Sequence, residues 1–404
     1  MAYINESDCL QVLQAKLGFN DFELDDYKLV PFEEIRGFHG SHALLKIHAT
    51  VEGEKRAFSF FVKSAANNEL VFERYWSRAK LFAKEHLMLT KIIKDLQKQI
   101  PRKLTADCYL SKLNQFVVME NLSLVGYDTA NIKDMDMPHA EAAIRTFADF
   151  HAASIIFEEK NGLTFRDKYK DISFESFFRF DPERTECLLY SADKGVRDVV
   201  EKYFQDLDQK IINDVLDKAA AAAERLAKPS GKYRNVICQG DPWGNNLLYK
   251  YKNGNPSEAI VVDFQAQRYA PPALEIQQFL HLGASTEFVI KHGEEVKNIY
   301  YDQMTKTLKH QNIDVARILP RDVFEESYRY YEEFGIATRL YYALLTKIPG
   351  EYLLKLAADE KEFLSLMVDG TSSVPLEAFE KHSRYRQTLT EAINGAIKFY
   401  ETHI

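Results

Sequence analysis

Short segments within the first 122 residues alternate between apolar and polar positions or carry unbroken apolar runs, as β-strands do. Four segments show this pattern: 42–51, 57–64, 107–112 and 115–122. Residues 6–17 and 70–99 instead carry apolar positions three and four residues apart with charges between them, which predicts a short helix and then one or two longer ones. We therefore expect the beginning of the chain to form a small β-rich lobe that contains a prominent helix.

After residue 125 the spacing of the apolar residues becomes mainly helical. Residues 137–160 are predicted to form one helix with Pro138 near its first turn, and residues 196–227, which contain an alanine run, are predicted to form another. From Pro271 onward the pattern is again mostly helical. A small β-rich lobe followed by a large helical lobe predicts an α+β fold.

Three short apolar runs interrupt the helical part of the chain. They lie at 235–239, 246–251 and 258–264. The second and third runs are separated by Asn253-Gly254, a strong signal for a two-residue hairpin turn. We expect a strand, a polar loop and then a hairpin in this region.

The composition narrows the class of protein. The 404 residues are 46% hydrophobic and 13% aromatic, which is ample material for a folded core. A net charge of −8 argues against an extended nucleic-acid surface, although a single anionic ligand needs only a few local cations. Four cysteines without a Cys-x-x-Cys pair indicate neither a zinc site nor a disulfide framework.

The sequence also bears on where the protein is expected to act. The first residues lack the basic and apolar regions of a secretory signal. No apolar run reaches the roughly 18–20 residues that a membrane-spanning helix requires. We expect a cytoplasmic protein with no membrane span, and the sequence leaves its oligomeric state open.

The loop sequence "CQGDPWGNNLLYKY" and the later "VVDFQ" carry residues suited to phosphoryl transfer from ATP. A kinase-type site needs an aspartate that accepts the proton of the acceptor hydroxyl, and oxygen ligands that bind Mg²⁺. Asp241 is followed five positions later by Asn246, and Asp263-Phe264 follows the predicted hairpin. Taken singly, these are ordinary turn or strand-end residues. Together they predict Asp241 as the catalytic base and Asn246 and Asp263 as metal ligands.

Two residues in the first lobe complete such a site. Lys63 ends an apolar strand, where it would hold the phosphates of ATP, and Glu85 in the following helix is its expected partner. The alternatives are an edge-strand lysine and a solvent-exposed glutamate. The order along the chain favours the functional interpretation.

The nucleotide would need two further contacts. In "IRGFHGSH", Gly37, Gly40 and Ser41 are candidates for the phosphate-covering loop, because glycine lets the backbone approach a phosphate; a plain turn is the alternative. Backbone groups of Glu120 and Leu122 are expected to face the adenine.

These contacts also define the expected domain boundaries. The predicted division is a first lobe at 1–118, a hinge at 119–124 and a second lobe at 125–404, which carries the catalytic and metal-binding loops.

The stretches "CQGDPWGNNLLYKY" and "VVDFQAQRYAPPALEIQQFLHL" resemble the ecdysteroid kinase-like proteins of insects, also called the CHK kinase-like family. "FADFHAAS", which contains His151, is similar to the family's first helix of the large lobe. The resemblance covers nearly the whole chain, from "IRGFHGSH" to about residue 330, and extends to choline kinases and aminoglycoside phosphotransferases. It implies a protein-kinase-like two-lobed fold and ATP- and Mg²⁺-dependent phosphorylation of a small-molecule hydroxyl, with Asp241 as the base.

The sequence departs from the family pattern at three points. Gln239 stands where the family usually has a histidine that braces the loop, and glutamine can also donate and accept hydrogen bonds. Glu275 stands where an aspartate is common. The phosphate-covering loop is also poor in glycine.

The resemblance implies an apolar alcohol as acceptor, either an ecdysteroid or a dietary or xenobiotic alcohol or glycoside, and therefore a role in hormone metabolism or detoxification. The aromatic-rich stretches 172–180 and 341–354 would line a pocket for it, or form ordinary helix-packing core. Two other functions stay open: a choline- or ethanolamine-type kinase, and a non-catalytic nucleotide- or steroid-binding pseudokinase. A protein-kinase function is disfavoured because no activation segment ending in Ala-Pro-Glu is found.

Overall fold

The first lobe is built on a five-stranded antiparallel sheet with the strand order β1-β2-β3-β5-β4. Its strands are β1 (Phe22–Pro31), β2 (Ser41–Val51), β3 (Glu54–Ser64), β4 (Cys108–Lys112) and β5 (Phe116–Glu120). The computed structural model describes residues 4–32, 40–65, 69–132, 134–180, 183 and 187–402. The four strands predicted from the sequence are confirmed, whereas β1 was not predicted. Its side chains are largely exposed, so it lacks an apolar pattern.

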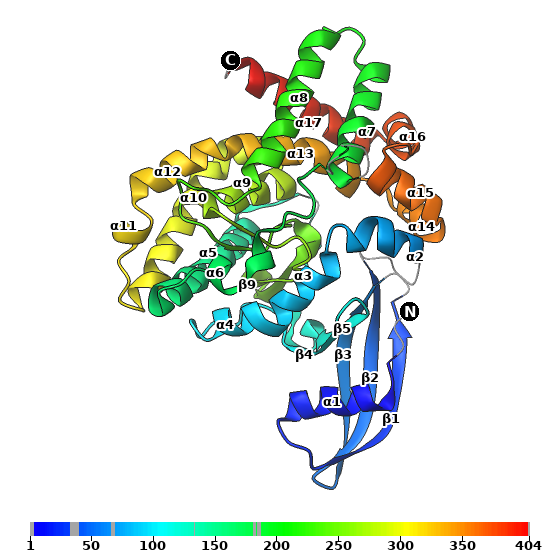
Figure 1. Cartoon of the computed structure of the whole chain (residues 1–404), viewed down its shortest axis with the longest axis vertical. Coiled ribbons are helices and arrows are strands. Elements are labelled where there is room, and N and C mark those ends of the chain that lie inside the picture. Colours follow the sequence, from blue (N-terminus) through cyan, green and yellow to red (C-terminus); the bar gives the residue numbers. More distant parts are fainter. Residues whose placement is uncertain are drawn as a thin grey trace.

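One face of this sheet is covered by α1 (Glu6–Leu17), as Figure 1 shows. Val12 and Leu13 of this helix pack with Leu45, Ile47 and other apolar residues of the sheet in a separate small core. The helix begins with a capping box in which Asn5 and Asp8 satisfy each other's backbone N–H groups. Because this core occupies one face, the opposite face of β3 is left for the cleft between the lobes.

The helical segment predicted at 70–99 forms two pieces with a break at Lys80, which has a left-handed φ of 53°. The pieces comprise α2 (Glu69–Val71), the π-helical turn η1 (Phe72–Ser77), α3 (Leu81–Leu87), the π-helical turn η2 (Met88–Ile92) and α4 (Ile93–Gln97). In Figure 1, α3 and α4 run between the sheet and the helical lobe. Side chains of α3 can therefore reach either lobe.

The second lobe is organised around α5 (Met137–Asn161), which is buried along most of its length. Pro138 occupies its first turn, as the sequence predicted, and Asp136 caps its N-terminus, which was not predicted. Helices α9 (Pro272–Gly283), α10 (Thr286–Lys309) and α13 (Glu332–Thr346) form one continuous core with it. Apart from two helices described next, the other helical elements of the described residues are η3 (Leu122–Val125), α6 (Phe165–Lys168), η4 (Lys170–Ser173), η5 (Gly244–Asn246), α11 (Val315–Ile318), α12 (Arg321–Tyr330), α14 (Gly350–Ala358), α15 (Glu360–Leu364), η6 (Ser365–Asp369), α16 (Val374–Lys381) and α17 (Ser383–Thr402).

The prediction of a single helix at 196–227 is wrong. The structure has two helices there, α7 (Leu188–Tyr203) and α8 (Gln209–Leu226). Asp208 accepts hydrogen bonds from the backbone N–H groups of Lys210 and Ile211, so a new N-terminus begins at this point. Helical spacing continues on both sides of the break, which hides it in the sequence.

Short strands carry the polar loops of the second lobe. They are β6 (Tyr127–Thr129), β7 (Val236–Cys238), β8 (Leu247–Lys252), β9 (Asn255–Val261) and β10 (Arg268–Ala270). β8 and β9 form the predicted hairpin, and both Asn253 and Gly254 adopt positive φ at its turn. β7 pairs with β10, so the loop that follows β7 and the loop that precedes β10 lie side by side.

The structure thus has the two-lobed α+β fold that the sequence predicted, with the sheet in one lobe and mostly helices in the other (Figure 1). Among the described residues, none of the helices combines the length and the apolar character needed to cross a bilayer.

Candidate active site

A buried ion-pair cluster lies between the lobes. Lys63 Nζ is 3.0 Å from Glu85 Oε2 and 2.9 Å from Asp263 Oδ1. The Lys63 and Glu85 side chains are 3% and 1% exposed, which rules out a solvent-exposed glutamate. Burial disfavours the charge on Lys63, but the Asp263 and Glu85 carboxylates outweigh it and raise the pKa of this lysine. Lys63 is therefore held as a cation facing two carboxylates.

The position of Lys63 follows from strand alternation. Lys63 pairs with His42 of β2 on one side and with Val117 of β5 on the other, so it lies on a central strand and the edge-strand alternative is wrong. Its neighbours Phe60 and Val62 are in the core beneath α1. Phe61 and Lys63 therefore point to the opposite face, toward the second lobe.

Asp241 lies in the loop that follows β7. Its Oδ2 accepts hydrogen bonds from Trp243 Nε1 at 3.0 Å and from Asn246 Nδ2 at 2.9 Å. Burial and the nearby Asp263 carboxylate raise the pKa of Asp241 to about 7, while Tyr342, Trp243 and Arg268 act in the opposite direction. The carboxyl is therefore suited to exchanging a proton near neutral pH.

The backbone of this loop depends on Gly240. Its φ is 91°, and a Cβ at this position would lie 2.0 Å from the carbonyl oxygen of Ala266. Only glycine can bring the two loops so close together.

Gln239 ties the same two loops together. Its Oε1 accepts from the backbone N–H of Asp241 at 2.7 Å. Its Nε2 donates to the carbonyl oxygens of Val262 at 3.0 Å and Asp263 at 2.5 Å. The glutamine therefore makes a bracing contact to each side, which is the role the family resemblance assigned to a histidine.

Glu275 anchors the backbone of the loop that follows β7. Its carboxylate accepts from the backbone N–H groups of Gln239 at 3.2 Å and Gly240 at 2.6 Å. His151 of α5 contacts the same carboxylate through Nε2 at 2.7 Å and contacts the Tyr300 hydroxyl through Nδ1 at 2.8 Å. All of these groups are buried, so the longer glutamate in place of an aspartate still buttresses the loop.

A second buried network, which sequence reasoning missed, supports the loop from the other side. Arg268 donates from Nη1 to the Gly240 carbonyl at 2.9 Å and from Nε to Glu175 at 2.9 Å. Glu175 also accepts from the backbone N–H groups of Phe177 and Phe178. One signal was present in the sequence: a charged residue at 268 next to the apolar segment that begins α9.

Lys84 extends this network into the first lobe. Its Nζ donates to the Phe174 carbonyl at 2.8 Å and to Ser176 Oγ at 3.0 Å. Burial lowers the pKa of Lys84 to about 7, with the opposing pull of Glu175 partly cancelled by Arg268. Lys84 and Glu85 are adjacent on α3 but point to different lobes.

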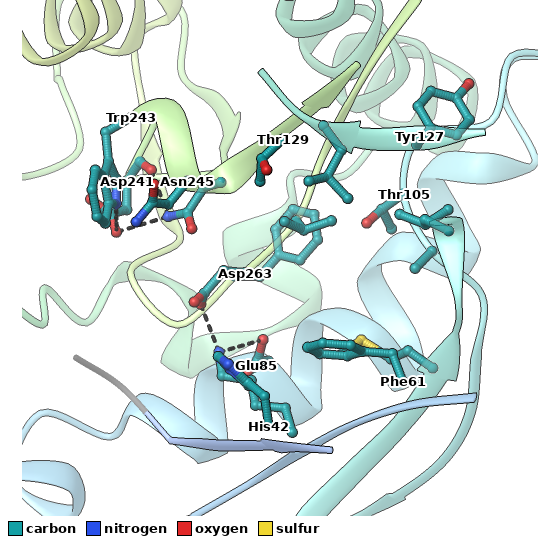
Figure 2. A pocket seen from close by; sticks show the side chains of 18 of the residues that line it. His42, Phe61, Glu85, Thr105, Tyr127, Thr129, Asp241, Trp243, Asn245 and Asp263 are labelled. Atoms are coloured by element: carbon teal, nitrogen blue, oxygen red, sulfur yellow. Dashed lines mark hydrogen bonds and ion pairs between the residues drawn. The ribbon is translucent and has the colours of Figure 1, made fainter. Parts of the chain in front are cut away.

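Lys63, Glu85, Asp241 and Asp263 line one cavity of about 610 Å³ (Figure 2). In Figure 2, Asp263 lies between the loop carrying Asp241 and the Glu85 side chain. Glu120 and Leu122 line the end formed by the segment that connects the lobes. The wall from the second lobe contains these side chains: Phe177, Leu188, Trp243, Tyr342, Leu345, Thr346 and Met367. Some residues of the aromatic-rich stretches therefore line the cavity, whereas others, such as Phe178, pack behind it.

The phosphate-covering loop is only partly described. Gly37 lies outside the described residues. Gly40 has a φ of 106°, and a Cβ there would lie 2.8 Å from the Ser64 carbonyl oxygen, so glycine is needed at this point. Ser41 pairs with Ser64 at the start of β2. Both residues lie beside the strand end that carries Lys63.

The donor set near Asp241 and Asp263 fits a hard cation. Asn246 uses its Nδ2 to bind the Asp241 carbonyl and carboxylate, which fixes the orientation of the amide. Within the described chain, its Oδ1 accepts no hydrogen bond and remains available as a ligand. The amide oxygen of Asn246 and the carboxylate of Asp263 both belong to residues lining the cavity, and oxygen ligands of these types suit Mg²⁺.

The ecdysteroid kinase-like family model matches residues 41–313, which is more than half of the chain. This chain belongs to the ecdysteroid kinase-like family. Membership of the family supports a small-molecule kinase. The matched region includes Lys63, Glu85, Asp241 and Asp263, and it ends before α13. The part of the cavity wall that α13 supplies is therefore outside the family pattern.

No curated protein matches the chain. Solved structures that are similar to it include a macrolide 2′-phosphotransferase, MphH, from Brachybacterium faecium, with 12% identity over 96% of this chain and 98% of that one and a TM-score of 0.39. A choline/ethanolamine kinase family protein from Mesorhizobium loti has 12% identity over 91% and 92% of the chains and a TM-score of 0.38. A microcompartment-associated aminopropanol kinase has 12% identity over 95% and 94% and a TM-score of 0.41.

Proposed function

We propose that this protein transfers the γ-phosphoryl group of ATP to the hydroxyl of an apolar small molecule. The observation that carries the proposal is one cavity that contains both the buried Lys63 cluster and the Asp241 carboxyl. Phosphoryl transfer depends mainly on positioning and electrostatic stabilisation, and this cavity offers groups for both. Family membership supports the same class of reaction.

In this proposal ATP binds at the end of the cavity next to the hinge. The backbone at Glu120 and Leu122 binds the adenine, Lys63 holds the phosphates, and Gly40 and Ser41 flank them. Glu85 keeps the lysine oriented. The chain is then divided into a first lobe at 1–118, a hinge at 119–124 and a second lobe at 125–404.

Asn246 and Asp263 are proposed to hold Mg²⁺, which supplies charge neutralisation for the phosphates when bound. Asp241 Oδ1 takes the proton of the acceptor hydroxyl. As that proton leaves, a bond forms between the acceptor oxygen and the γ-phosphorus, and the bond from this phosphorus to ADP breaks. Asp241 then releases the proton to solvent.

The wall of the cavity favours a bulky, uncharged acceptor. Leu188, Leu345 and Met367 are aliphatic, and burying apolar surface against them stabilises an apolar alcohol. An ecdysteroid, or a dietary or xenobiotic alcohol or glycoside, has this character, which would place the protein in hormone metabolism or detoxification.

A choline- or ethanolamine-type amino alcohol is the second candidate. Phe177, Trp243 and Tyr342 line the same wall, and aromatic faces attract a quaternary ammonium group. The aliphatic residues beside them favour the apolar alcohol, so choline serves as the competing substrate in the test.

The experiment incubates the protein with ATP and Mg²⁺ and with ecdysone, a phenolic glucoside, a steroidal glycoside or choline in separate reactions. Mass spectrometry then detects any phosphorylated product. Asp241→Asn is expected to lower turnover about 10²- to 10⁴-fold, because the general base is lost. Asp214→Asn, on the exposed face of α8, is the matched control and should leave turnover unchanged.

Phosphorylated ecdysone or glycoside that disappears with Asp241→Asn would support the proposal. If choline were the only compound phosphorylated, the acceptor would be the second candidate, an amino alcohol, and not an apolar alcohol. Binding of Mg-ATP without any product would favour the non-catalytic pseudokinase, and failure to bind Mg-ATP would contradict the proposed nucleotide site.

A further inference from the structure

Two buried polar atoms beside the proposed transfer site lack hydrogen bonds of standard geometry to the described residues: Asp241 Oδ1 and the Tyr342 hydroxyl. Buried polar atoms in folded proteins nearly always have a partner. Both side chains line the same cavity, and Tyr342 is 7% exposed. One atom is a hydrogen-bond acceptor and the other is a donor, so the pair has the polarity needed to bind a hydroxyl group.

The ring of Tyr342 is held by packing rather than by its hydroxyl. It stacks on Phe178 with 5.7 Å between ring centroids and 26° between planes. Phe178 in turn packs edge-on against Phe334 and under the Arg268 guanidinium. Because Arg268 also binds Gly240, the tyrosine and the Asp241 loop are supported by one network. The packing of the ring therefore positions the hydroxyl, and the group with which this hydroxyl interacts is the Asp241 carboxyl of the same cavity.

The two carboxylate oxygens of Asp241 have different surroundings. Oδ2 is occupied by Trp243 and Asn246, which fix the plane of the carboxylate. Oδ1 is left for the reacting group. Burial keeps the Tyr342 hydroxyl protonated by raising its pKa well above the ordinary value, so it acts as a donor.

We propose that Tyr342 binds the acceptor alcohol directly: its hydroxyl donates to the acceptor oxygen while that oxygen donates its own proton to Asp241 Oδ1. The two bonds orient one lone pair of the acceptor oxygen for attack. The acceptor proton passes to Asp241 as the bond to the γ-phosphorus forms and the bond to ADP breaks, and Tyr342 keeps its own proton. This inference rests on the proposed function and adds a catalytic residue to it.

Tyr342 lies beyond residue 313, where the match to the family ends. The family's loop motifs therefore do not identify it. Its neighbour Tyr341 offers a matched control: this side chain is also buried, but its hydroxyl is bonded to Asp193 and to the Leu216 carbonyl, away from the cavity.

The test compares Tyr342→Phe and Tyr341→Phe with the wild-type chain, using the panel alcohol that is turned over fastest. Tyr342→Phe should lower kcat/KM for the alcohol about 10- to 100-fold, as expected for a lost hydrogen bond to a charged transition state. Its affinity for Mg-ATP and its Tm should stay at the wild-type value. Tyr341→Phe should show the reverse pattern, with a lower Tm and unchanged kcat/KM.

A kcat/KM for Tyr342→Phe within about twofold of wild type would overturn the inference and leave the proposed function intact. A lower Tm together with weaker Mg-ATP binding would also overturn it, because the role would then be structural. No phosphorylated product from the wild-type chain would overturn the proposed function, and the acceptor role of Tyr342 with it.

Discussion

At the scale of single residues, Gln239 is one of the side chains that fix the shape of the loop carrying Asp241. A histidine has two ring nitrogens, whereas this glutamine uses one oxygen and one nitrogen to contact three backbone groups. Each contact replaces water at a buried position, so losing one leaves a backbone group unsatisfied. Glutamine at position 239 thus braces the loop with different atoms from those of the histidine that the family usually has.

Gln239→Ala is expected to lower kcat at least about tenfold, because the Asp241 N–H and the Asp263 carbonyl lose their partner and the two loops separate. Gln239→His should retain more activity than Gln239→Ala, since a ring nitrogen restores part of the bracing. Steady-state kinetics on the three proteins checks this. Equal kcat for Gln239→Ala and wild type would show that the brace is dispensable.

At the scale of elements, the loop from β7 to β8 and the loop from β9 to β10 act as a pair. β7 and β10 are hydrogen-bonded neighbours, and β8 and β9 form a hairpin. These strands therefore fix the positions at which both loops begin and end. Gly240 permits a close approach between the loops, and Arg268 and Glu275 each bind it. The relative position of Asp241 and Asp263 follows from this pairing.

Gly240→Ala should therefore disturb both loops. The added Cβ meets a backbone oxygen at 2.0 Å and the residue would have to keep a left-handed φ, so the free energy of unfolding should fall by about 2 kcal/mol or more. Gly244→Ala is the control for this measurement, since a Cβ there meets nothing within 4 Å. Thermal unfolding compares the two variants, and equal Tm values would contradict the close approach.

At the scale of the whole molecule, buried and partly buried polar contacts join the lobes across the cleft. Lys84 of α3 reaches the segment around Ser176, and Arg102 donates to Asp149 at 2.9 Å and to the Ala259 carbonyl at 3.0 Å. The Thr105 hydroxyl donates to the Val261 carbonyl at 2.6 Å. The orientation of the lobes is therefore set by specific hydrogen bonds as well as by apolar packing.

The buried Lys84 should leave a pH signature in stability. Its pKa is about 7 in the folded chain and near its ordinary value of 10.5 when unfolded, so between these values the unfolded state binds more protons. The free energy of unfolding should rise with pH, on the order of 2 kcal/mol between pH 7 and pH 9. Lys84→Met should remove this rise, and the exposed Lys91→Met should keep it. Chemical denaturation at pH 7 and pH 9 measures this rise. An equal rise in the free energy of unfolding for wild type and Lys84→Met would contradict the prediction.

Sequence patterns predicted the elements whose side chains alternate or repeat clearly, such as β2, β3 and α5. They missed β1 because most of its side chains are exposed, and they missed β6 and β10 because these three-residue strands carry no apolar run, unlike β7. The spacing of the motifs identified Asp241, Asn246 and Asp263 as candidate site residues. It could not find the support that Glu175 gives or the role proposed for Tyr342, because both depend on packing between segments far apart in the chain.

The most direct test of the central claim follows the γ-phosphoryl group itself. ATP labelled in that group is incubated with Mg²⁺ and the best panel alcohol, using wild type, Asp241→Asn and wild type with excess EDTA. We predict that the label appears on the alcohol only with wild type and Mg²⁺, because both the base and the metal are required. Label transfer that survives Asp241→Asn at the wild-type rate would contradict the account.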